Sequence, residues 1–183
     1  MVMKVLSESS CSRLLLVLFC LTGCAMGLRI HLGSCTVSAH THELRKHYSE
    51  IRASVIAEDS NMDMRLLRGA VMKNMQEGET CCFLSLLLRF YVERVFTSHA
   101  SSHPQDRSTI SALANAFITI KRDLKLCHCH CGENTRGRLD SLHTDFGKLG
   151  VQQAALKAVG ELDSVLEWLE GLGPHTHTHP SSP

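Results

Sequence analysis

The arrangement of cysteine is the feature that most constrains how this chain can fold. The 183-residue sequence contains nine cysteines, and three of them fall in the string CHCHC, at Cys127, Cys129 and Cys131. Alternating cysteine and histidine are compatible with a metal site or with a set of disulfides. The choice between a metalloprotein and a disulfide-braced protein depends first on the compartment in which the chain folds.

The amino-terminal segment predicts export. Basic residues precede the apolar run LLLVLFCL at 14–21, and the small residues of AMG at 25–27 fit a cleavage site. The run is shorter than the roughly 20 apolar residues that a membrane-spanning helix needs. We expect residues 1–27 to be a signal peptide and the mature protein to be secreted, without membrane insertion. The alternative takes LTGC, which ends at Cys24, as a bacterial lipoprotein signal.

Removal of the signal peptide leaves an even set of cysteines, namely Cys35, Cys81, Cys82, Cys127, Cys129 and Cys131. In an oxidising compartment this set predicts three disulfides. Neighbouring Cα atoms lie about 3.8 Å apart, closer than the usual disulfide window of about 4.4 to 6.8 Å, so Cys81 and Cys82 need separate partners. The clustered three share one face of an extended segment, and we expect each to pair with one of the other three. The spacing leaves the order of pairing open.

A metal site is the competing interpretation of CHCHC. Structural zinc sites commonly separate two cysteines by at least two residues, because both thiolates must reach corners of one tetrahedron. Here single residues separate the cysteines, and His128 and His130 point away from the thiol face of an extended segment. We therefore expect disulfides, with no metal and no cofactor.

The apolar pattern predicts an all-α fold. Apolar residues recur with a helical period along most of the mature chain, and strand-like alternation is nearly absent. Five or six helices fit residues 28–171, followed by a flexible His- and Pro-rich tail at 172–183. The segment Phe83–Phe96 is apolar on most sides and is expected to form the buried central helix. The polar stretch 97–106 has the composition of a linker.

The remaining helices follow from shorter patterns and expected caps. Thr41 is the expected cap of the first helix, and Thr80 that of the central one. Ser60 with Asp63 resembles a capping box that opens a short helix through Met75. The expected buried stripe of the first helix is Leu44, Tyr48, Ile51 and Val55. Later helices are expected to carry apolar residues at 110–124, 139–149 and 152–169.

Composition and motifs argue against several functions. The mature chain has as many basic as acidic residues, which gives no electrostatic footprint for nucleic acid. The sequence contains no G-x-S-x-G, P-loop, G-x-G-x-x-G or H-E-x-x-H motif. We expect no catalytic residues and no enzymatic activity.

Several strings together resemble the interleukin-10 cytokine family, in its interleukin-20 branch. They are YSEIRASV, DSNMDMRLLR, CCFLSLLLRFYVERVF, ISALANAFITIKRDLKLCHCHCG and QAALKAVGELDSVLEW, and the match covers about residues 33 to 170 in order. The resemblance implies a class II cytokine bundle of six or seven helices that is a monomer. It also implies pairing of Cys35 with Cys127, Cys81 with Cys129 and Cys82 with Cys131. One departure is the single residue between the first two clustered cysteines, where relatives have several.

The same resemblance implies a function. Members of this branch bridge two class II cytokine receptor chains, here a heterodimer of interleukin-20 receptor type, and trigger Janus kinase and STAT signalling in immune or epithelial responses. The positions that match the family's contacts for one receptor chain are Asn61, Asp63, Arg65, Lys157 and Glu161. For the second chain only the faces of the first and fourth helices can be named. The alternative function is a receptor-binding antagonist or another secreted helical binding protein without signalling.

Each of these positions also has a purely structural interpretation. Asp63 could serve a helix cap, and Lys157 and Glu161 are four residues apart, as in a helical ion pair.

Overall fold

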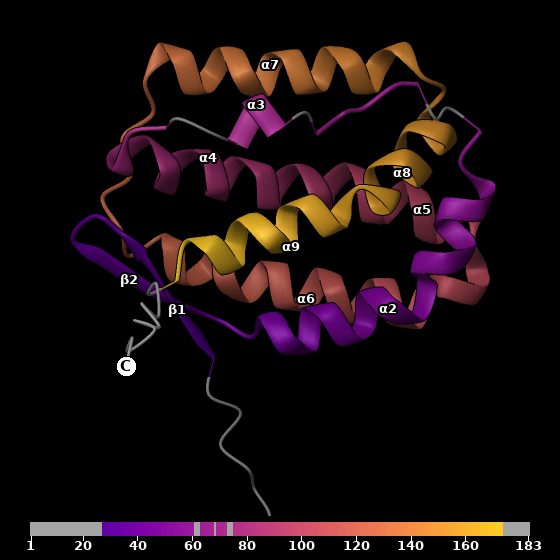
Figure 1. The fold of residues 1–183 in the computed structure, drawn as a ribbon, viewed down its shortest axis with the longest axis horizontal. Helices are drawn as coiled ribbons and strands as arrows, with labels where there is room; N and C mark the ends of the chain where they lie inside the picture. The colour runs from indigo at the N-terminus through magenta and orange to yellow at the C-terminus, as the bar shows by residue number, and fades with distance from the viewer. Residues whose placement is uncertain (1–26, 61–62, 68, 73–74, 174–183) are drawn as a thin grey trace, which may run out of the picture.

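A helical bundle with a small hairpin at one end makes up the described structure (Figure 1). The computed structural model describes residues 27–60, 63–67, 69–72 and 75–173. Residues 1–26 of the expected signal peptide and 174–183 of the expected tail lie outside this part. Among the helices that are described, none is long and apolar enough to cross a bilayer.

The elements follow one another in an order dominated by helices. The strands are β1 (Leu28–Leu32) and β2 (Cys35–Ala39), and the helices are α2 (Thr41–Glu58), α3 (Gly69–Met72), α4 (Glu77–Phe90), the π-helix η1 (Tyr91–Phe96), α5 (Thr97–Ser102), the 3-10 helix η2 (Pro104–Asp106), α6 (Arg107–Leu124), α7 (Glu133–Lys148), α8 (Val151–Gly160) and α9 (Leu162–Gly171). The prediction of an all-α fold with three disulfides is confirmed.

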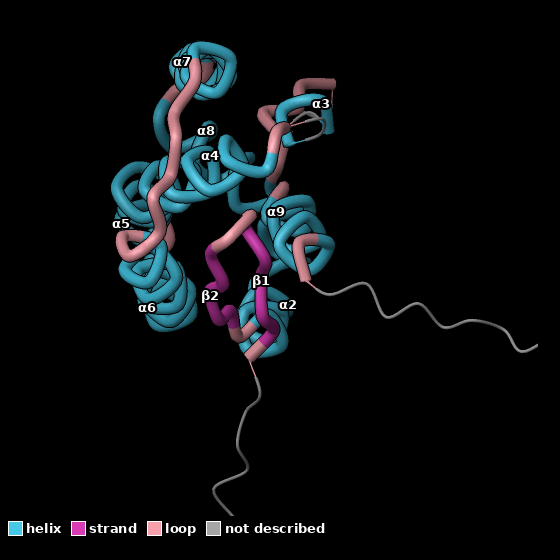
Figure 2. The backbone as a smooth tube through the Cα atoms, turned by 90° about the vertical axis from the view of Figure 1, so that its left-hand side faces the viewer, coloured by secondary structure: helices cyan, strands magenta, loops and turns pink. Residues whose placement is uncertain are grey.

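The β1–β2 hairpin is the element that the sequence analysis missed. Its strands are antiparallel, with Ile30 opposite Val37, and both of these side chains are buried while their sequence neighbours face outward. Gly33 takes a φ of 66° in the Gly-Ser turn, a conformation that glycine adopts at no steric cost. Figure 2 shows the hairpin at the end of the bundle, where it contacts α4, α6 and α9.

The central helix is longer than predicted. Residues 77–102 run without a break through α4, η1 and α5, and Phe83, Tyr91 and Phe96 are at most 2% exposed. The prediction of a buried helix at 83–96 is confirmed. The prediction of a linker at 97–106 is wrong, because α5 occupies most of it and buries His99 completely. The polar composition of this stretch is typical of a linker, and it does not reveal that the helical turn around His99 is packed.

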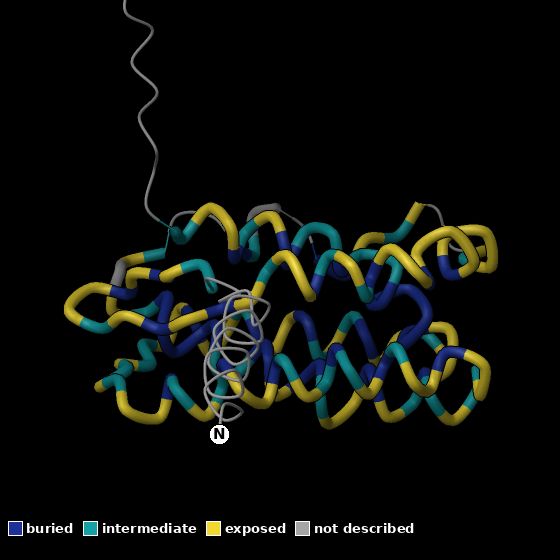
Figure 3. Tube along the Cα trace, turned by 90° about the horizontal axis from the view of Figure 1, so that it is seen from below, coloured by how far each residue is buried: buried dark blue, intermediate teal, exposed yellow. Residues whose placement is uncertain are grey.

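The sequence predicts the buried faces of the helices more accurately than it predicts where the helices begin and end. The stripe of the first helix is confirmed, since Leu44, Tyr48, Ile51 and Val55 are all buried. The helix begins at Thr41, however, so its N-cap is His40 and the cap prediction is one residue off. Thr80 lies inside α4, whose N-cap is Gln76, and its hydroxyl donates to the Gln76 carbonyl at 3.1 Å. Figure 3 shows buried and exposed positions alternating around each helix.

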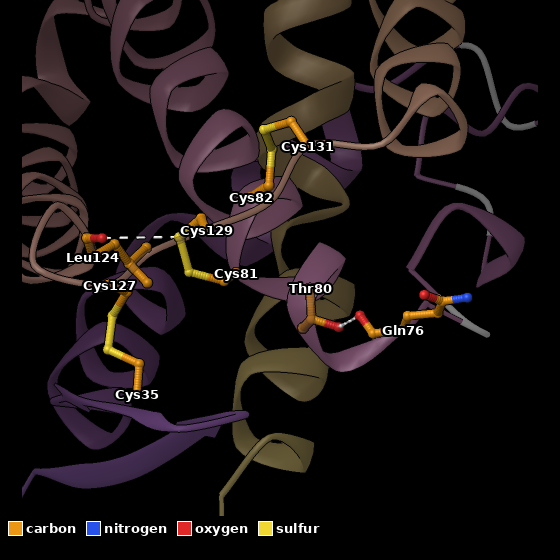
Figure 4. The surroundings of a disulfide bond; sticks show 9 residues. All are labelled: Cys35, Gln76, Thr80, Cys81, Cys82, Leu124, Cys127, Cys129 and Cys131. Atoms are coloured by element: carbon orange, nitrogen blue, oxygen red, sulfur yellow. Dashed lines mark hydrogen bonds between the residues drawn. A yellow bond between two sulfur atoms is a disulfide. The ribbon is translucent and has the colours of Figure 1, made fainter.

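Three disulfides anchor the segment between α6 and α7. They join Cys35 to Cys127, Cys81 to Cys129 and Cys82 to Cys131 (Figure 4), which are the pairs that the resemblance implies. The segment alternates as expected, because its three cysteines are half-buried while His128 and His130 are exposed. The hairpin, α4 and the end of α6 are thereby tied to one short strip.

His99 is a buried titratable group in a polar corner of the bundle. Its Nε2 lies 2.8 Å from Oδ2 of Asp106, and its ring stacks on that of His103 with the centroids 4.3 Å apart. His103 Nε2 in turn lies 2.9 Å from Oε2 of Glu58, at the end of α2. Burial lowers the pKa of His99 from its ordinary value of 6.5, and the bond to Asp106 opposes that effect.

Replacing His99 is expected to make stability less sensitive to mild acid. Because its pKa is lower in the folded than in the unfolded chain, its stabilising contribution is complete above about pH 6.5 and is lost as the pH falls through the folded-state value. The free energy of unfolding in guanidinium chloride should therefore fall on acidification from about pH 7.5 to about pH 5.5, and fall less in His99→Gln. His42→Gln, at an exposed position of α2, is the control. Equal pH dependence in all three proteins would contradict the prediction.

Removing the Cys35–Cys127 disulfide is expected to destabilise the whole fold. The bond closes a span of 92 residues, and loss of such a link typically costs about 2 to 5 kcal/mol because the unfolded chain gains conformational freedom. The double variant Cys35→Ser with Cys127→Ser leaves no unpaired thiol behind. Its unfolding midpoint in denaturant should fall well below that of the wild type, and an unchanged midpoint would refute the expectation.

Candidate functional site

One side of α2 packs against the two carboxy-terminal helices, α8 and α9. We call the surface of α2, segment 63–67 and the α8–α9 junction the α2–α9 face. The Tyr48 hydroxyl fixes the two layers by donating to the Gly160 carbonyl at 2.8 Å, and burial raises the pKa of Tyr48 to about 12. Figure 1 shows α9 running above α2 along this side of the bundle.

The break between α8 and α9 creates the central feature of this face. The sequence predicts one helix at 152–169, but the structure divides it at Glu161. The Glu161 carboxylate leaves the junction and accepts hydrogen bonds from the backbone N–H groups of Leu66, at 3.1 Å, and Leu67, at 2.6 Å. Glu161, in the carboxy-terminal part of the chain, thus fixes the backbone of Leu66 and Leu67, which lie 95 and 94 positions earlier.

These two bonds explain why the short helix expected from Ser60 to Met75 is wrong. Leu66 and Leu67 are buried, as the apolar pattern implies, but they lie in a bend. Their N–H groups bond to a carboxylate, where a helix would direct them to carbonyls of the preceding turn. The described helix of this region, α3, begins only at Gly69, so Asp63 does not cap it.

Lys157 forms ion pairs beside the contact between Glu161 and segment 63–67. It is 4% exposed, and its ammonium lies 2.8 Å from Oδ2 of Asp59 and 3.9 Å from Oε1 of Glu161. The helical pair with Glu161 that its spacing suggests is therefore present. Burial raises the pKa of Glu161 above its ordinary value, while the two N–H bonds and the charge of Lys157 oppose that rise. A buried charge pair of this kind is retained only where its remaining hydrogen bonds are satisfied.

A second charge cluster on the same face was missed by the sequence analysis. Arg45 donates hydrogen bonds to both carboxylate oxygens of Glu170 through Nε and Nη2, each at 2.9 Å. Its Nη1 donates to Asp163 at 2.6 Å. Arg52 Nε donates to the other oxygen of Asp163 at 2.8 Å. The two arginines and the two acids are each seven residues apart, so two turns of α2 match two turns of α9. That spacing was visible in the sequence, but only the packing makes it meaningful.

The predicted contact residues fall into two groups. Asp63 and Arg65 are exposed on segment 63–67, whereas Lys157 and Glu161 are largely enclosed. Asn61 lies outside the described residues. A cavity of about 290 Å³ is bordered by the end of α2, segment 63–67 and the junction; its lining includes Arg65, Lys157, Glu161 and Ile56. Ile56 is 43% exposed and contributes an apolar side chain to this otherwise largely polar lining.

Nothing in this arrangement resembles a metal centre. Over the described residues, no three histidine, cysteine, aspartate or glutamate side chains are placed to hold an ion. The chemistry of the α2–α9 face is that of recognition, because it offers fixed charges and one exposed apolar side chain around a hollow.

Glu161→Gln is expected to loosen segment 63–67. The amide retains one acceptor oxygen, so at least one of the two backbone N–H groups loses its partner. Hydrogen bonds to charged groups contribute about 1.5 to 3 kcal/mol, which sets the expected loss of stability. Hydrogen exchange at the Leu66 and Leu67 amides should accelerate. Glu167→Gln, at an exposed position of α9, is the matched control; equal protection in both variants would rule out the anchoring role.

Comparisons with known proteins agree with one another. The family model described as Interleukin 10 matches residues 27–173. Mouse (Mus musculus) interleukin-20 is 42% identical over 146 residues, which cover 77% of this chain and 83% of the relative. Human (Homo sapiens) interleukin-19 is 30% identical over 143 residues, 75% of this chain and 81% of the relative.

Solved structures give the same assignment. The crystal structure of human interleukin-19 aligns with a TM-score of 0.67 at 29% identity, covering 73% of this chain and 88% of the other. An edited human interleukin 24 aligns with a TM-score of 0.68 at 30% identity, covering 79% and 99%. The chain therefore belongs to the interleukin-10 family, in its interleukin-20 branch, and is a signalling ligand and not an enzyme.

Proposed function

We propose that this protein is a secreted, monomeric cytokine that bridges two class II cytokine receptor chains of the interleukin-20 receptor type. Bridging brings the receptor-bound Janus kinases together and activates STAT proteins in immune or epithelial cells. The single observation that carries the proposal is the α2–α9 face, where a segment with exposed charges is pinned beside an exposed apolar side chain.

The first receptor chain is assigned to this face. Ile56 offers an apolar anchor, and Arg65 lines the same cavity. Asp63 is exposed two residues before Arg65 on segment 63–67. An apolar centre with a polar surround is typical of the part of an interface that contributes most to affinity. Asn61, which is outside the described residues, is proposed as a contact on the same segment.

Lys157 and Glu161 have a different proposed role from the one their family positions imply. Both are mostly enclosed and engaged with Asp59, Leu66 and Leu67. We assign them to positioning segment 63–67 for the receptor. A pre-ordered segment loses less conformational entropy on binding, which favours affinity.

The second receptor chain is assigned to the faces of α2 and α6. These helices pack together, and a cavity of about 250 Å³ lies between them, lined in part by Glu43, His47 and Asn115. It involves the first half of α2, whereas the α2–α9 cavity involves the second half. The two cavities lie on different halves of α2 and beside different helices. This separation supports simultaneous binding of two receptor chains.

Reversing the charge of Arg65 tests this assignment. We expect Arg65→Glu to weaken binding to the cognate ectodomain at least tenfold in a panel of soluble class II receptor ectodomains, because a like-charge contact costs several kcal/mol. Arg136→Glu on α7 is the matched control, since Arg136 is also exposed but lies off the α2–α9 face. Unchanged binding in Arg65→Glu would move the contact elsewhere.

STAT phosphorylation in cells that carry the receptor pair is the functional readout of the same variants. Wild type and Arg136→Glu are expected to signal, and Arg65→Glu to require a higher concentration. Receptor binding without phosphorylation by the wild type would instead indicate an antagonist.

A further inference from the structure

A third hollow, a cleft between α4–η1 and α7, lies away from the receptor surfaces just assigned. Figure 1 shows α7 and α2 at opposite edges of the bundle. The cleft has a volume of about 240 Å³, and three of its lining residues are arginines: Arg89, Arg94 and Arg136. All three are exposed. The proposed receptor contacts do not include these three arginines.

The positive charges in this cleft are only partly neutralised. Glu93 is shared between Arg89, at 3.8 Å, and Lys121, at 3.7 Å. Glu93 and Asp140 both line the cleft; Asp140 is four residues from Arg136 on α7, yet no ion pair joins those two within the described structure. Two guanidinium groups, those of Arg94 and Arg136, thus have no carboxylate partner there.

Arg94 is held in place by groups that carry no negative charge. Its guanidinium carbon lies 5.3 Å from the centre of the Phe146 ring, and Nη1 lies 3.4 Å from Nδ1 of His143. Burial lowers the pKa of His143, and the charges of Arg94 and Arg89 lower it further, with Asp140 acting in the opposite direction. His143 therefore lies between the guanidinium group of Arg94 and the ring of Phe90, with the ring centroids of Phe90 and His143 5.1 Å apart.

We propose that this cleft binds the sulfate groups of a sulfated polysaccharide. A guanidinium group offers a planar fork of donors that fits an oxyanion, and pairs of this kind are among the stronger hydrogen bonds in proteins. Arg136 and His143 are two helical turns apart on α7, about 10 Å, so the cleft extends beyond a single small anion. The inference goes beyond the receptor role and shares with it only the extracellular setting.

Binding of the full mature chain to an immobilised, heparin-derived oligosaccharide tests the proposal. We expect binding that weakens with added salt, and affinity that falls at least tenfold in the double variant Arg94→Gln with Arg136→Gln. Arg136→Gln alone is expected to show part of this loss without affecting folding, because no side-chain bond of Arg136 is broken. Arg29→Gln with Arg107→Gln removes the same charge from exposed positions on β1 and α6. An equal loss in that control would overturn the proposal.

Chemically matched probes identify what the cleft recognises. The desulfated oligosaccharide should bind at least tenfold more weakly, and inorganic phosphate or sulfate alone should bind weakly. If free sulfate bound as tightly as the oligosaccharide, the cleft would be a small-anion site and the polysaccharide assignment would be wrong. The same conclusion would follow if the desulfated probe bound equally well.

A nuclear magnetic resonance titration of His143 places the ligand. A sulfate bound beside Arg94 should raise the pKa of His143, since it offsets the arginine charges. No change at His143 during saturable binding would locate the ligand elsewhere and overturn the proposal. Receptor-ectodomain binding should be unchanged in Arg136→Gln, while Arg65→Glu should keep its affinity for the oligosaccharide. These crossed readouts separate failure of this inference from failure of the receptor assignment.

Discussion

Three disulfides meet on the strip 127–131, and the rest of the bundle is arranged around that junction. The strip follows directly from α6 and leads into α7, while its partners lie on β2 and at the first turns of α4. The hairpin, the end of α6 and the segment that leads into α7 are thereby fixed to one another and to the buried central helix. Cross-links of this reach restrict the unfolded chain more than they strengthen any local contact. The helices can therefore devote exposed faces to binding without weakening the core.

The α2–α9 face, which we propose as a receptor surface, depends on a different and non-covalent constraint. Segment 63–67 has no regular secondary structure, yet Leu66 and Leu67 are buried and their N–H groups are satisfied. Glu161 supplies the acceptors, and Lys157 balances its charge. The polar groups that fix the segment are turned inward, and the charges available to a partner are turned outward. Family positions alone do not distinguish these two roles, but burial does.

Much of the bundle could be predicted from the sequence, because buried stripes such as Leu44 and Tyr48 are local patterns with a fixed period. The number of disulfides followed from counting, whereas their order required the family resemblance. Elements that depend on distant partners were not predictable in the same way. Leu66 and Leu67 look helical until Glu161, 95 and 94 residues later, is known to lie beside them. The hairpin had a usable signal in the Gly-Ser turn between short alternating runs, but each run was too brief to stand out from the helical background. The burial of His99 could not be predicted from its neighbours, because a histidine among serines is compatible with a solvated loop as well as with a packed turn.

The π-helix η1 determines how the two ends of the central helix are oriented about their common axis. In a π-helix, bonding partners are five residues apart instead of four, so one additional residue is accommodated without breaking the rod. Arg89 in α4 and Arg94 in η1 lie on either side of the start of this widened turn, and both line the cleft beside α7. Without the additional residue, everything before Tyr91 would be rotated by about 100° relative to α5. The register between the α7-facing surface of α4 and the α8-facing surface of α5 is thus set by a single widened turn. Deleting one residue within 91–96 would rotate α4 relative to α5 by about 100°. Such a change would disturb the packing along the whole central helix, and not only the contacts of one side chain.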